Sequence, residues 1–92
     1  MGKVYLSYLI TEEYGLEAVI LVRVSSGFQG NIEKVLQVKG VKKVYELTGD
    51  IDLLIEATAS SETDLRRIVD EILEIKGVES TDTRIVLSRM VK

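Results

Sequence analysis

Two carboxylates and a glycine lie close together in the segment Thr48-Gly49-Asp50-Ile51-Asp52. The side chains of Asp50 and Asp52 can accept hydrogen bonds from an ammonium group, because an ionised carboxylate offers only acceptors. Glycine lets a ligand approach the main chain closely, so the N–H groups of Gly49 and Asp50 can donate to a carboxylate. A simpler interpretation is also open: Gly-Asp is common in hairpin turns, and Asp52 is then a solvated strand residue.

Thr81 and Thr83 form a second group of polar side chains. They are two residues apart, so in a strand their hydroxyls project from the same side. Each hydroxyl can donate and accept a hydrogen bond, which suits a ligand that carries both kinds of group. Threonine is also a good strand former, so both residues are equally compatible with a purely structural role.

The residue types that are missing exclude much of enzyme chemistry. The sequence contains no His and no Cys, which removes the usual general base, the thiolate nucleophile, disulfides and the commonest zinc ligands. Asp50 and Asp52 could in principle act as acid and base, but a hairpin tip is solvated and no nucleophile accompanies them. We therefore expect no catalytic residue, no metal site and no cofactor.

Length and charge narrow the class further. Ninety-two residues, 46% of them hydrophobic, are enough for one folded domain. Twelve Lys and Arg against fifteen Asp and Glu give a net charge of −3, so direct binding to nucleic acid is not expected. The longest apolar run, residues 18–22, is too short to span a membrane, and no signal peptide is recognisable. These features predict a cytoplasmic protein.

Hydrophobic periodicity predicts the order of the elements. Alternating or continuous β-branched runs indicate strands at residues 3–10, 17–25, 41–48, 51–58 and 78–88. Apolar residues at helical spacing indicate one helix before Gly40 and another that is capped by Ser61 and followed by Gly77. Gly49-Asp50 is typical of a tight two-residue hairpin link.

The two halves of the chain resemble each other. Residues 33–41 (EKVLQVKGV) align with residues 70–78 (DEILEIKGV), 37 positions later. A repeated βαβ unit predicts an α+β, ferredoxin-like βαββαβ sandwich: a four-stranded antiparallel sheet, two helices on one face, and an extra N-terminal strand. The alternative is chance similarity between two amphipathic helix ends, which leaves the order of elements unchanged.

The strands are apolar on both faces, as at Val19, Ile20 and Leu21, although two helices cover only one face. Monomers tolerate only small exposed apolar patches, so a face-to-face dimer is expected. Alternatively, residues 3–10 fold back over part of their own sheet.

Residues 44–56 (VYELTGDIDLLIE), 75–78 (IKGV) and 81–87 (TDTRIVL), in this order, resemble the effector-binding (RAM) domain of the leucine-responsive regulatory protein/AsnC transcription-regulator family. The resemblance covers residues 17–91, and residues 3–15 resemble the family's linker strand. Residues 1–92 are therefore expected to form one RAM-like domain, with a linker strand at 1–16 and a βαββαβ core at 17–92. It implies a cleft between dimers that binds a free amino acid, with site residues Thr48, Gly49, Asp50, Asp52, Thr81 and Thr83. It also implies homo-oligomers of eight or ten chains and association with full-length family relatives. The family's helix-turn-helix has no counterpart in this sequence, and Ile51 stands where relatives often carry an aromatic residue.

Three functions are compatible with these observations. The first is a non-enzymatic amino-acid-binding and oligomerisation module in the transcriptional regulation of amino-acid metabolism. The second is a dimeric ferredoxin-like enzyme, against which the absence of His and Cys argues. The third is a structural partner module that binds no metabolite. A ligand screen separates the first from the third, and turnover of a substrate would support the second.

Overall fold

A computed structural model describes residues 15–92 of the chain. The elements are, in order, β1 (Leu16–Val24), the 3-10 turn η1 (Ser26–Phe28), α2 (Ile32–Leu36), β2 (Val41–Glu46), β3 (Leu53–Ala59), α3 (Glu62–Leu73) and β4 (Val78–Ile85). This is the predicted βαββαβ order. The expected strand at residues 3–10 lies outside the described residues.

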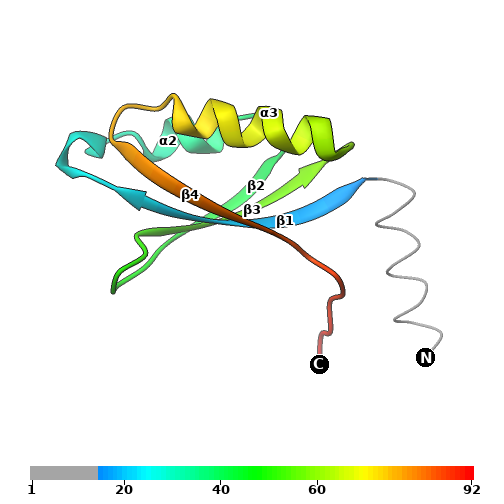
Figure 1. The fold of residues 1–92 in the computed structure, drawn as a ribbon. Coiled ribbons are helices and arrows are strands. Elements are labelled where there is room, and N and C mark those ends of the chain that lie inside the picture. Colours follow the sequence, from blue (N-terminus) through cyan, green and yellow to red (C-terminus); the bar gives the residue numbers. More distant parts are fainter. Residues whose placement is uncertain (1–14) are drawn as a thin grey trace.

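The four strands form one antiparallel sheet in the order β2-β3-β1-β4. Both helices lie on the same side of this sheet (Figure 1). Two βαβ units that interlock in this way give a ferredoxin-like α+β sandwich. The predicted fold class is confirmed.

The core lies between the sheet and the helices. Alternate residues of β1 and β3 are buried, so that Ile20 opposes Ile55 on the helix-covered face. The helices contribute Val35 from α2 and Ile68 and Ile72 from α3, all fully buried. Fixed strand pairing therefore directs one set of alternating apolar residues to the helices and the other set to the opposite side of the sheet.

No helix of the described chain covers the opposite face of the sheet, which we call the open face (Figure 1). Its centre is made by Val19, Leu21 and Leu54, which are only partly buried. Charged residues lie in the same rows: Lys43 pairs with Glu56 across β2 and β3. The open face is thus an apolar stripe bordered by charges, as the two-sided strand pattern predicted.

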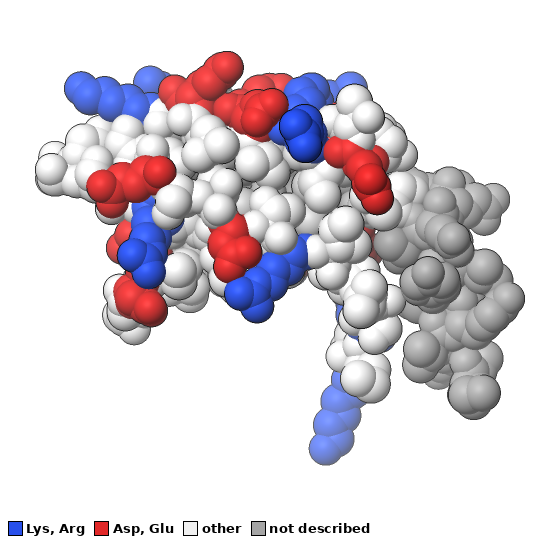
Figure 2. Space-filling model, viewed as in Figure 1, with Lys and Arg blue, Asp and Glu red and all other residues white. Residues whose placement is uncertain are grey.

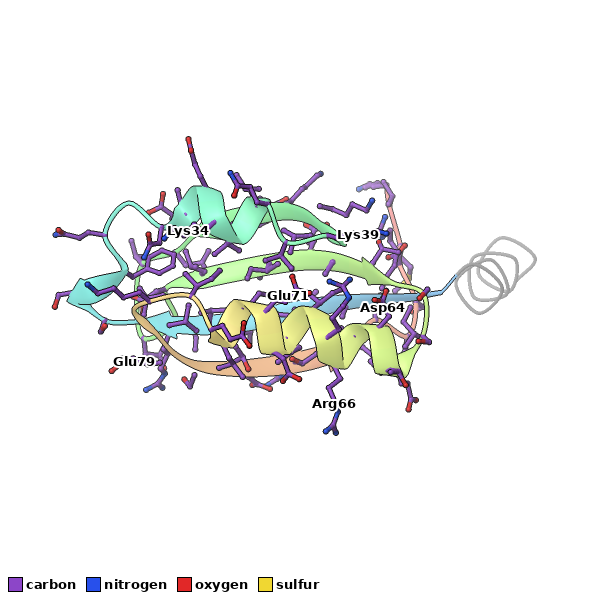
Figure 3. The ribbon with its side chains drawn as sticks, turned by 90° about the horizontal axis from the view of Figure 1, so that it is seen from above. Lys34, Lys39, Asp64, Arg66, Glu71 and Glu79 are labelled. Carbon is purple, nitrogen blue, oxygen red and sulfur yellow. The ribbon has the colours of Figure 1, made fainter. Side chains whose placement is uncertain are left out.

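Polar contacts hold the N-terminus and the middle of α3. The hydroxyl of Ser61 accepts a hydrogen bond from the N–H of Asp64 at 3.1 Å, which confirms the predicted N-cap. Arg67 forms ion pairs with Asp64 and Glu71 and donates to the carbonyl of Lys39 in the turn before β2. Seen from above, Asp64 and Glu71 lie on the side of α3 toward α2, and Arg66 points away from it (Figure 3). Arg67 thereby ties α3 to the other βαβ unit.

The internal repeat extends to individual hydrogen bonds. After α2, the N–H of Val38 donates to Val35 and that of Val41 donates to Val38. The same bonds occur 37 residues later, from Ile75 to Ile72 and from Val78 to Ile75. Chance similarity between two helix ends does not predict such agreement, so the repeat is structural. No helix formed by residues 15–92 is long and apolar enough to cross a membrane.

Candidate functional site

The hairpin between β2 and β3 is longer than the sequence predicted. The N–H of Leu47 donates to the carbonyl of Asp52 at 2.8 Å, and residues 48–51 form the loop beyond this pair. The expected two-residue link at Gly49-Asp50 is therefore wrong. Gly49 has φ +103°, a conformation that favours glycine, and a side chain there would meet no atom within 4 Å.

Asp52 anchors the base of this loop to the end of β1. Its N–H donates to the carbonyl of Val22 at 3.0 Å, and its Oδ2 accepts a hydrogen bond from the N–H of Val24 at 2.8 Å. The bond to an ionised carboxylate is stronger than one between neutral groups. Among residues 15–92, no hydrogen bond reaches the other carboxylate oxygen, Oδ1. Oδ2 of Asp52 therefore has a structural role, and Oδ1 remains able to accept another hydrogen bond.

The tip of the loop is exposed at Thr48, Gly49 and Asp50. In Figure 1 the hairpin projects from the sheet on the side away from the helices. Within the described part of the chain, the side chains of Thr48 and Asp50 make no hydrogen bond or ion pair. The carboxylate of Asp50 is thus available to a ligand or to another chain.

Thr81 and Thr83 lie across β1 from the hairpin. Strand register places Thr81 opposite Val22 and Thr83 opposite Ile20, both of which are buried beneath the helices. The two hydroxyls therefore share one side of β4, as predicted, but this is the helix-covered side. Both residues are partly buried, and their hydroxyls are unpaired within residues 15–92.

One chain does not gather the six predicted residues into a single cavity. Asp52 and Thr81 flank the same end of β1, since Asp52 bonds to Val22 and Thr81 pairs with it. The loop tip, in contrast, points to the open side of the sheet, whereas the threonines face the helices. A ligand that touches all six residues would have to be bound by more than one chain.

Between Thr81 and Thr83, the side chain of Asp82 projects to the open face. It forms an ion pair with Arg84 at 3.0 Å. The hydrogen bond that the Arg84 guanidinium donates to Asp82, followed by the negative charge of Asp82, raises the pKa of Arg84. Acidic and basic side chains are interspersed over the face shown in Figure 2, without a patch of one sign. Nothing on that face favours a polyanion.

A hollow of about 750 Å³ lies on the open face. Its lining includes Val19, Lys43, Tyr45, Leu54, Glu56 and Arg89. The sequence did not indicate these residues as a group. The two-sided apolar pattern of β1 and β3 predicted only that the face without helices is covered, by a second copy or by residues 3–10. The charged members come from β2, β3 and the residues after β4, and only strand register brings them together.

Residues 15–92 thus form a ferredoxin-like α+β sandwich with an exposed β2–β3 hairpin that Asp52 joins to the end of β1. The family model of the Lrp/AsnC ligand binding domain matches residues 17–92. The chain belongs to this family, and the resemblance found in the sequence is confirmed.

Solved structures agree with this assignment. A Thermus thermophilus protein superposes with a TM-score of 0.74 at 26% identity, covering 84% of this chain and 99% of the other. A Neisseria meningitidis transcriptional regulator, solved as a complex with L-Met, gives a TM-score of 0.78 at 23% identity. That match covers 90% of this chain but 56% of the regulator, and at this identity it shows the fold alone.

The module also resembles part of an enzyme. The homocitrate synthase of Sulfurisphaera tokodaii is 35% identical over 77 residues, and that of Saccharolobus islandicus is 38% identical over 77 residues. Each match covers 82% of this chain and 17% of the synthase. The chain therefore spans about a sixth of the length of these relatives.

Proposed function

We propose that this protein is a non-enzymatic effector module that binds a free amino acid and thereby regulates transcription in amino-acid metabolism. The observation that carries the proposal is the β2–β3 hairpin. It presents an unpaired Asp50 carboxylate and a positive-φ Gly49 at an exposed tip, on a base anchored by Asp52.

The chemistry of the site matches both ends of a free amino acid. Asp50, together with Oδ1 of Asp52, is suited to accept hydrogen bonds from the α-ammonium. The backbone N–H groups of Gly49 and Asp50, and hydroxyls such as those of Thr81 and Thr83, are suited to donate to the α-carboxylate. Two solved relatives are complexes with L-methionine, which supports this ligand class.

The site is completed by neighbouring copies. The loop tip and the threonines lie on different sides of one sheet, so the ligand would be held at a contact between dimers. We propose that the dimer forms through the open face and that dimers assemble into closed rings of eight or ten chains. Effector binding at the contact between dimers then changes the stability of the assembly.

DNA contact would come from a partner. Residues 15–92 form the sandwich, its loops and the segment after β4, and the net charge of the chain is −3. We propose that full-length DNA-binding relatives associate with this module and that the effector changes how they assemble. The match to part of homocitrate synthases favours a second target, an enzyme of that kind controlled by the same site. Identifying which protein co-purifies with the tagged chain from its native cells separates the two targets.

A thermal-shift screen against the twenty amino acids tests the proposal. A ligand at 100 times its dissociation constant that binds only the native state adds about 2.7 kcal/mol of stability, which corresponds to about 11–22 °C in melting temperature for a domain of this length. Asp50→Ala and Thr83→Val should abolish this shift and leave the unliganded melting temperature almost unchanged. If no amino acid shifts the transition, or if both variants respond as the parent does, the effector assignment fails and the structural-partner function replaces it.

A further inference from the structure

The residues that follow β4 form an exposed apolar segment, which we call the 86–92 arm. Leu87, Met90 and Val91 are 77%, 84% and 85% exposed, the highest values among the large hydrophobic residues of the described chain. Soluble chains seldom present three such side chains within five positions unless they meet a partner. The arm runs off the end of the sheet on the side away from the helices (Figure 1).

The start of the arm is held in place by β1. The N–H of Val86 donates to the carbonyl of Glu17 at 2.8 Å, which extends the β4–β1 ladder by one residue. The guanidinium of Arg89 forms an ion pair with the Glu17 carboxylate. These two contacts give the arm a defined direction from the sheet, so its apolar side chains are presented from a fixed position.

The arm also forms one wall of the hollow on the open face. Val86, Ser88 and Arg89 line the hollow on the β4 side, and Lys42 and Lys43 of β2 line it on the opposite side. The sheet order β2-β3-β1-β4 places these two walls at opposite edges. Strand register places the two walls at the same end of the sheet. Val41 of β2 pairs with Ala57 of β3. Val86 bonds to Glu17 of β1, which pairs with Thr58, the next residue of β3.

This arrangement selects one way of packing two open faces together. A two-fold axis parallel to the strands puts the β4 edge of one copy over the β2 edge of the other and keeps the same ends of the sheets together. Under this axis, the arm of each copy lies over the Lys42 and Lys43 wall of its partner's hollow. An axis across the strands would instead put the arm over the other end of β4, where Glu79 and Ser80 are exposed.

We infer that the 86–92 arm is exchanged between two copies of this chain, so that Leu87, Met90 and Val91 of each copy fill the hollow on the open face of the other. The inference rests on the proposed open-face dimer and adds that the 86–92 arm of each copy contacts the hollow of the other. The hollow has an apolar floor at Val19 and Leu54, which matches these side chains. Each copy supplies one arm and one hollow, so the contact closes on itself and leaves neither unfilled.

Cross-linking tests the exchange directly, because the natural sequence has no cysteine. Met90→Cys and Lys43→Cys variants carrying different tags are co-expressed and treated with a short bismaleimide linker. A cross-link between the two differently tagged chains can form only between copies. We expect this product for Met90→Cys with Lys43→Cys, and not for Met90→Cys with Arg66→Cys, whose side chain points away from the sandwich on α3 (Figure 3).

A second measurement gives the contribution of the arm. The triple variant Leu87→Ser, Met90→Ser, Val91→Ser should raise the dissociation constant of the dimer by at least about 100-fold in sedimentation experiments. The matched control Leu36→Ser, Leu73→Ser removes half-exposed leucines at the helix ends and should leave that constant unchanged.

A dimer that persists unchanged in the triple variant, or equal cross-linking to positions 43 and 66, would overturn arm exchange. The proposed effector function would stand in that case, because the amino-acid thermal shift measures it separately.

Discussion

Replacing Asp52 by alanine should loosen the hairpin at its base, whereas replacing Asp50 should not. Oδ2 of Asp52 accepts a hydrogen bond from the Val24 N–H at 2.8 Å, and this bond joins the hairpin to the end of β1 across 28 positions of sequence. Asp50 lies two residues away on the same loop but is exposed and has no partner among residues 15–92. The two carboxylates therefore form a matched pair that separates anchoring from recognition.

The expected size of the effect follows from the bond that is lost. A hydrogen bond to a charged group contributes about 1.5–3 kcal/mol, and the part-buried site of Asp52 suggests the lower value. A domain of this length loses about 4–8 °C in melting temperature per kcal/mol, so Asp52→Ala should melt about 6–12 °C below the parent. Asp52→Asn keeps an acceptor oxygen without the charge and should lose about half as much. Asp50→Ala should change stability by less than about 0.5 kcal/mol.

Thermal unfolding followed by circular dichroism, without added amino acid and at fixed protein concentration, measures these differences. Hydrogen exchange provides a local check, because the Val24 amide should exchange faster in Asp52→Ala than in Asp50→Ala. Equal melting temperatures for the parent and Asp52→Ala would refute the anchoring role. An equal loss in Asp50→Ala would show that the loop as a whole, and not the bond to Val24, stabilises the hairpin.

Three further outcomes are expected. Gly77→Ala should lower the free energy of unfolding by more than about 3 kcal/mol in urea titrations, because its Cβ would lie 2.2 Å from the backbone nitrogen of Phe28. At Gly30 a Cβ would meet open space, so Gly30→Ala should lower the free energy of unfolding only by the strain of its positive φ, about 1 kcal/mol. The hydrogen bond from the Ser60 N–H, followed by the hydrogen bond from Arg67, holds the pKa of Asp64 below its ordinary value of 3.8. The ionised carboxylate of Asp64 therefore stabilises the fold above that pH. The stability difference between the parent and Asp64→Asn should disappear as the pH falls through the lowered pKa. In gel-shift assays at physiological salt the pure protein should not retard duplex DNA, and sequence-specific retardation would contradict the assignment of DNA contact to a partner.

Local patterns in the sequence predicted the order of the elements and the buried face of the second helix. The spacing of Leu65, Ile68 and Ile72 predicted a helix with one buried face, and all three side chains are buried in α3. Ser61 was recognised as its cap because capping depends on a bond to a residue three positions away. The repeat at residues 33–41 and 70–78 indicated the two βαβ units. Each of these features depends on neighbours close in sequence, so each can be read without the fold.

The arrangement of the candidate site depended on tertiary structure. The sequence showed that Thr81 and Thr83 share a side of their strand, but only pairing with β1 decided that this side faces the helices. The side-chain period of a strand is two, so a register shift of one residue would have turned both hydroxyls to the open face. No local signal contains that information.

Asp52 and the 86–92 arm show the same limit. The sequence identified Asp52 as a carboxylate near a turn, but its bond to Val24 joins segments that meet only because β1 lies beside β3. The predicted strand at residues 78–88 included the first three residues of the arm, whereas β4 ends at Ile85 and only the Val86 N–H continues its pairing with β1. Composition and periodicity thus determined which residues form strands, helices and core, whereas non-local strand pairing decided which polar groups face a ligand, the helices or a second chain.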